Sequence, residues 1–166
     1  MFNNVSKIRA ISRIILLMLI AATVVFIFAN SLKSKEQSAE DSSAVSGFIA
    51  TIFPPDTDLG AFIKEYIRKI AHFTEYGMLG IEIAIYVCLY TEKKYKWAGG
   101  SVLLALCIGF IDESLQYISE RGPEVSDIWV DVGGFATFSL LAYGTAYAIY
   151  LVSGFIKKIR LEKNNG

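Results

Sequence analysis

Four long apolar runs constrain the fold of this 166-residue chain more than any other feature of its sequence. A run of about 20 apolar residues is the length that crosses a lipid bilayer as an α-helix. Because 54% of the residues are hydrophobic and only 19% are charged, we expect an all-α integral membrane protein. We predict a four-helix bundle in a single domain over residues 1–166, with spans at about 14–29, 70–90, 97–118 and 127–155.

The connection between the first two runs is the least regular part of the chain. The first run ends in residues 27–30, which lack the small-x-small pattern of a signal-peptide cleavage site, so we predict an uncleaved helix. Polar residues follow up to about Asp58, after which apolar residues recur at helical spacing towards Ile70. This piece either lies at the membrane surface as an interfacial helix or leads straight into the second span.

Lysine and arginine in the short flanking segments set the expected orientation, because such residues stay on the cytoplasmic side of a membrane. The N-terminus, the connection between the second and third runs and the C-terminal tail are all basic, and an even number of spans puts these three segments on one side. We therefore predict a multi-pass protein of the plasma membrane with both termini in the cytoplasm. The residues concerned are Lys7, Arg9, Arg13, Lys93, Lys94, Lys96, Lys157, Lys158, Arg160 and Lys163.

This topology brings polar residues from three spans to one depth, just below the outer surface. The second span begins there, the third ends there and the fourth begins there. Accidental polar residues in separate helices would not share one depth, so we predict a common site. Its members are His72, Glu75, Asp112, Glu113, Gln116, Asp127 and Asp131, with Arg121 in the loop directly above them.

Helical spacing gives these residues common faces. In the second span His72, Glu75, Tyr76 and Glu82 follow one stripe, and Asp112 and Gln116 are four residues apart in the third span. Lipid cannot satisfy such groups, so we expect the stripes to face each other or a wet cavity. Glu82 lies about two turns deeper, and we predict an acid that is hydrogen-bonded within the bundle. The pairs Gly99-Gly100 and Gly133-Gly134 predict close helix packing.

The sequence offers little for a metal or cofactor. It contains one His, and carboxylates with a single His suit several metals only loosely. Cys88 and Cys107 both fall in apolar runs, where a structural disulfide is not expected. No phosphate-binding glycine loop, zinc motif or Ser-His-Asp order is present. We therefore predict no metal, no cofactor and no nucleic-acid partner, with membrane lipids as the immediate surroundings.

Three blocks of residues resemble the signatures of VanZ-like membrane proteins. Residues 69–79 match K-x-x-H-F-x-E-Y-x-x-L, and residues 112–116 are similar to D-E-x-x-Q. Arg121, Ser126-Asp127 and Gly133-Gly134 resemble the R-x(n)-D-x-x-x-N-x-x-G block, with Asp131 where the family usually has Asn. The resemblance covers residues 63–148. An Asn at this position can donate an amide hydrogen bond, which an Asp can replace only when protonated.

The resemblance implies a role at the bacterial envelope, since the family's namesake is linked to low-level resistance to the glycopeptide teicoplanin. One hypothesis is an enzyme that acts on a polyprenyl-phosphate-linked or peptidoglycan-precursor headgroup at the outer leaflet. His72 or Glu75 would then act as a base and Asp112 or Glu113 as an acid. The predicted substrate-binding residues are Lys69, Tyr76, Gln116, Arg121, Asp127 and Asp131.

Two further functions use the same residues differently. A non-catalytic protein would capture the headgroup, or shield it from an antibiotic, with Arg121 and the carboxylates as recognition groups. A small transporter or accessory subunit is the third hypothesis. It is the weakest of the three, because four helices are few for a carrier and no interrupted helix is evident.

Overall fold

The chain folds into five α-helices. The structure is a computed structural model that describes residues 2–91 and 94–165. Within these ranges every element of regular secondary structure is α-helical, as the sequence predicts. The helices are α1 (Phe2–Ser31), α2 (Lys35–Ala50), α3 (Asp58–Tyr90), α4 (Lys94–Ile118) and α5 (Val125–Asn165).

Four of the five helices are long and apolar enough to cross a membrane. The candidate spans are Asn4–Ser31, Asp58–Tyr90, Gly99–Ile118 and Val125–Lys157. Each predicted span lies inside one of these helices, but the helices extend further at one or both ends than hydropathy alone suggests. Only 11% of the apolar window in α1 and in α5 is buried inside the protein, so most of their apolar side chains require a lipid environment. The chain is therefore a multi-pass membrane protein.

The connection between the first two spans contains a helix that hydropathy did not reveal. Ser34 caps α2 by accepting a hydrogen bond from the backbone of Gln37, whose side chain in turn accepts from the backbone N–H of Ser34. A second cap at Thr57 starts α3, and Asp58 lies in its first turn. The segment after Asp58 leads into the second predicted span without a break, because α3 runs from Asp58 to Tyr90. The position of its first turns at the membrane surface stays a prediction.

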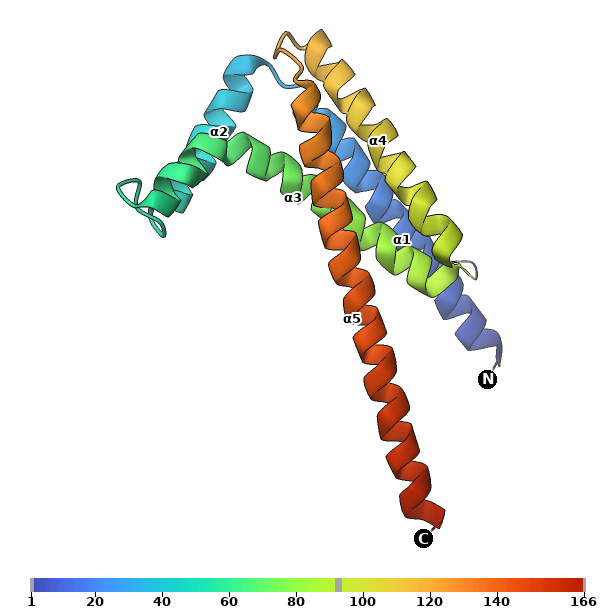
Figure 1. Ribbon diagram of the computed structural model, residues 1–166. Helices are drawn as coiled ribbons and strands as arrows, with labels where there is room; N and C mark the ends of the chain where they lie inside the picture. The colour runs from blue at the N-terminus through green and yellow to red at the C-terminus, as the bar shows by residue number, and fades with distance from the viewer. Residues whose placement is uncertain (1, 92–93, 166) are drawn as a thin grey trace.

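The helices place the two chain termini at the same end of the bundle, opposite the α4–α5 connection (Figure 1). The start of α1 lies beside the end of α3, where the Arg13 guanidinium donates to the Tyr86 hydroxyl over 3.0 Å and Ser12 pairs with Tyr90. The end of α1 approaches the middle of α3, where Asn30 donates to Glu75. The helix α2 and the first turns of α3 project together to one side of the bundle (Figure 1).

The most extensive helix contact joins α3 to α5, and glycine makes it close. A Cβ atom at Gly134 would collide with the backbone oxygen of Phe73, and one at Gly80 would lie 2.5 Å from the backbone oxygen of Phe135. Small residues at such points let two membrane helices approach backbone to backbone. The predicted close packing is thus present at Gly134.

Two other predictions for the bundle interior have different outcomes. A Cβ atom added at Gly99 or Gly100 would have no described neighbour within 4 Å, so the expected close packing is absent there. Glu82 does accept a hydrogen bond within the bundle, from Thr23 of α1 over 2.9 Å. The buried core around these contacts is apolar and includes Ile27, Leu79, Val87, Ala105, Ile108 and Phe135.

Replacing Gly134 with Ala should destabilise the protein, because the added methyl group meets the backbone of α3 rather than a flexible side chain. We expect a loss of at least about 1–3 kcal/mol, the usual cost of overpacking, which outweighs the gain of about 1 kcal/mol in helix propensity. Thermal unfolding in detergent measures this loss of stability. Gly144→Ala on the same helix is the matched control, since no described atom lies within 4 Å there, and equal melting temperatures for the two variants would refute the close contact.

Candidate functional site

Three of the predicted site residues meet in the bundle interior, one from each of three helices. We call His72 of α3, Asp112 of α4 and Asp131 of α5 the His–Asp cluster. Nδ1 of His72 lies 3.2 Å from Oδ1 of Asp131 and 3.6 Å from Oδ2 of Asp112. The His72 side chain is 10% exposed and both aspartate side chains are fully buried. Two acids and a base from separate helices therefore share a small buried volume.

The surroundings of the His–Asp cluster satisfy some of its oxygens and leave others without a donor. The Ser31 hydroxyl, at the end of α1, donates to Oδ1 of Asp112. The Oδ2 atoms of Asp112 and Asp131 are buried and receive no hydrogen bond from the described residues. The Tyr76 hydroxyl is also buried and has no hydrogen-bond partner among them. Such groups are costly to bury unpaired.

Glu113 and Gln116, the next two predicted residues, form a separate chain of hydrogen bonds. The side-chain NH2 of Gln116 donates to Oε1 of Glu113 over 2.9 Å. The side-chain oxygen of Gln116 accepts from the Arg68 guanidinium. Oε2 of Glu113 accepts from the backbone N–H of Glu124, just before α5, over 2.8 Å. Both carboxylate oxygens of Glu113 thus hold groups of the protein itself, and Glu113 ties the α4–α5 connection to α4.

Lys69 of α3 forms an ion pair with Asp127 at the start of α5. The Lys69 ammonium is 3.7 Å from Oδ1 of Asp127 and 3.6 Å from Glu124. Asp127 is buried in the first turn of α5, where a carboxylate is favoured by the free N–H groups of the helix end. The two residues belong to one ion-pair group that joins α3 to α5, beside the His–Asp cluster rather than inside it.

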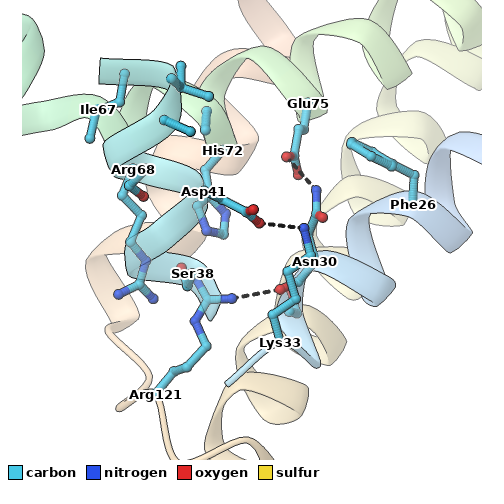
Figure 2. A pocket seen from close by; sticks show the side chains of 15 residues that line it. Phe26, Asn30, Lys33, Ser38, Asp41, Ile67, Arg68, His72, Glu75 and Arg121 are labelled. Atoms are coloured by element: carbon cyan, nitrogen blue, oxygen red, sulfur yellow. Dashed lines mark hydrogen bonds and ion pairs between the residues drawn. The ribbon is translucent and has the colours of Figure 1, made fainter. Parts of the chain in front are cut away.

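A pocket lies between the end of α1, α2 and the first half of α3, and we call it the α2–α3 pocket (Figure 2). Its volume is about 380 Å³. His72 of the cluster and Glu75 are both part of its wall. The polar residues that line it are Asn30, Ser31, Lys33, Ser38, Asp41, Ser42, Arg68, His72, Glu75 and Arg121, and the apolar ones are Phe26, Ala44, Val45, Ile67 and Ala71.

The charges in the α2–α3 pocket are unevenly paired. Lys33 and Asp41 form an ion pair of 2.6 Å, and Glu75 accepts from Asn30 over 2.9 Å. Arg121 instead donates to the backbone oxygen of Asn30 and to the Ser38 hydroxyl, 2.7 Å each (Figure 2 draws the first). Partial burial and the nearby charge of Arg68 lower the pKa of Arg121. The two arginines therefore lie close enough to repel each other.

Sequence reasoning missed several residues of this site. Arg68 is one turn before His72 on α3, so it lies on the same helix face as His72 and Glu75. Other charged residues surround it in the sequence, and for that reason it was not singled out. Ser31 and Asn30 contribute through the end of α1, and Ser38 through α2. Hydropathy assigned these last residues to a polar connection. The last turn of α1 brings Asn30 and Ser31 to the site, and the fold of α2 brings Ser38 there.

Glu113→Ala should destabilise the protein, because it removes two acceptor atoms and leaves the Glu124 N–H without a partner. Hydrogen bonds to a charged group contribute about 1.5–3 kcal/mol each, so the melting temperature in detergent should fall clearly. Glu65→Ala, an exposed acid on α3, is the matched control. A Glu113→Ala protein with the same melting temperature as the Glu65→Ala control would contradict this structural role.

Comparison with known proteins agrees with the resemblance found in the sequence. The VanZ/LLP1 family pattern matches residues 14–150, which include α2, most of α1 and α5, and all of α3 and α4. No curated protein and no solved structure matches the chain. The matched range contains every member of the His–Asp cluster and of the α2–α3 pocket. The chain belongs to the VanZ/LLP1 family.

Proposed function

We propose that this protein binds the phosphate-bearing headgroup of an envelope lipid in the α2–α3 pocket. The observation that carries the proposal is the pair Arg68 and Arg121. Neither guanidinium lies within 4.0 Å of a carboxylate of the described residues, and the bonding partners of both are neutral groups. The Nε atom of each is buried and has no described acceptor. Two neighbouring cations with no carboxylate of the described residues in ion-pair contact favour an anion between them.

The apolar part of the pocket wall favours a lipid over a soluble anion. Phe26, Val45 and Ile67 line the same cavity as the two arginines. A cavity of about 380 Å³ fits a headgroup and the first part of a chain, not a whole lipid. Because α1 and α3, which supply two walls of the pocket, are candidate membrane spans, the rest of the lipid chain would extend into the bilayer.

We place the pocket at the outer surface of a bacterial plasma membrane. Basic residues are concentrated at both termini and in the α3–α4 connection, which favours the cytoplasm for these segments. The pocket is lined by Lys33 of the α1–α2 connection and Arg121 of the α4–α5 connection. Figure 1 shows both connections at the opposite end of the bundle from the termini. An outward headgroup site suits polyprenyl-phosphate-linked and peptidoglycan-precursor lipids, and capture of such a lipid is a route to teicoplanin resistance.

Single cysteines test this orientation in a background that lacks Cys88 and Cys107. Asp56→Cys, in the exposed α2–α3 connection, should react with a membrane-impermeant maleimide on intact cells. Lys157→Cys, near the end of the last span, should react only after the cells are permeabilised. The reverse labelling pattern would put the pocket on the cytoplasmic side and reject an outer-leaflet substrate.

Arg68→Met and Arg121→Met should each weaken binding of a polyprenyl phosphate by about tenfold or more, since a lost charge-assisted hydrogen bond costs about 1.5–3 kcal/mol and 1.4 kcal/mol is tenfold. Binding to the purified protein in nanodiscs measures the change. An uncharged polyprenol of equal length should bind weakly to the unaltered protein. In cells, Arg68→Met should also remove any increase in teicoplanin resistance that the unaltered gene confers.

Lys64→Met is the matched control, because it removes an exposed positive charge from the same helix outside the pocket. Equal affinity in Lys64→Met, Arg68→Met and the unaltered protein would contradict the proposal. Mass spectrometry of the recovered lipid separates the two main functions. Unchanged lipid supports a binding or shielding protein, whereas a processed headgroup supports an enzyme. An enzyme is the second candidate because His72 of the His–Asp cluster lines the pocket.

A further inference from the structure

The His–Asp cluster has the composition and spacing of a metal site. Its three candidate ligand atoms, one from each residue, all lie within 4.8 Å of one another. They come from α3, α4 and α5, so three separate helices hold them in place. A metal ion about 2.0–2.2 Å from each ligand needs only a small inward movement of such a set.

Charge within the cluster is the second observation. Among the described residues, no Lys or Arg nitrogen lies within 4.0 Å of Asp112 or Asp131, and the ion-pairing partner of both is His72. Two buried carboxylates facing one imidazole leave net negative charge in the interior when both are ionised, even if the imidazole is protonated. Arg121 attracts Asp112 but forms no ion pair with it. Buried charge that its neighbours offset only in part is unfavourable, and a divalent cation offsets two carboxylates while the imidazole stays neutral.

The unpartnered oxygens point to the same conclusion independently. Asp112 and Asp131 are both fully buried, and Oδ2 of each receives no hydrogen bond from the described residues. For Asp112 this is the oxygen that lies 3.6 Å from Nδ1 of His72, whereas its other oxygen is held by Ser31. A serine that orients one carboxylate oxygen and leaves the other for coordination is the arrangement found around metal ligands.

We propose that His72, Asp112 and Asp131 bind one divalent transition-metal ion, through Nδ1 of the imidazole and an oxygen of each carboxylate. One nitrogen and a set of carboxylate oxygens suit Zn²⁺, Mn²⁺ or Fe²⁺ and disfavour Cu⁺, which prefers sulfur. The proposal reverses the sequence-based expectation of no metal, which rested on the single His. It does not depend on the proposed lipid, although His72 also lines the α2–α3 pocket.

Metal content tests the site directly. The full-length protein in detergent is stripped with a chelator, loaded with Zn²⁺ or Mn²⁺, passed through a desalting column and analysed for bound metal. We expect one ion per chain for at least one of these metals, and a melting temperature that rises with metal concentration, because binding to the folded state stabilises it. An unaltered protein that retains neither metal overturns the proposal without reference to any variant.

Asp131→Asn and His72→Gln should each lower metal affinity by about tenfold or more while the protein still elutes as a single species. Glu82→Gln is the matched control, since Glu82 also has a buried oxygen without a described partner but lies outside the cluster. It should retain the metal. Equal metal binding in all three variants would assign the ion to another place and overturn the proposal. Arg68→Met should keep the metal even if it loses the lipid, so the two proposals fail separately.

Discussion

The cost of placing carboxylates among membrane-spanning helices determines the arrangement of this protein. Lipid offers no hydrogen bonds, so Asp112, Glu113 and Asp131 are tolerable only where other helices supply partners. Each of them faces inward and meets a group from another part of the chain. Asp112 accepts from Ser31 of α1, Glu113 accepts from the backbone of Glu124 in the α4–α5 connection, and Asp131 pairs with His72 of α3. The apolar surfaces of α1 and α5 remain outside, where lipid covers them. Hydrophobic length creates the spans, and polar pairing fixes how they face one another.

Close packing of α3 on α5 makes this pairing possible. Gly134 brings the two backbones together one turn beyond Asp131, and Phe73, the residue it contacts, directly follows His72. The 3.2 Å approach of His72 to Asp131 is therefore a consequence of glycine contact in the next turn. The end of α1 completes the cluster through Ser31 and continues into α2, whose residues form the outer wall of the α2–α3 pocket. Fold and site are thus built by the same few contacts.

Much of the fold follows from the sequence because bilayer thickness imposes a length that hydropathy detects, and the shared depth of His72, Asp112 and Asp131 followed from counting spans. Depth alone does not distinguish neighbours, however. It grouped Glu113 with the cluster, although its partners are Gln116 and Glu124. The depth argument also failed to predict Arg68 as a site residue and α2 as a helix. The positions of both depend on the tertiary packing of polar segments, which hydropathy treats as connections.

A high-resolution structure of the protein reconstituted with a polyprenyl phosphate tests the central claim most directly. Our account predicts phosphate density between the guanidinium groups of Arg68 and Arg121, with the start of the chain against Phe26, Val45 and Ile67. Bound lipid density on a different face, with the α2–α3 pocket closed by contacts between Arg68, Arg121 and protein carboxylates, would contradict it.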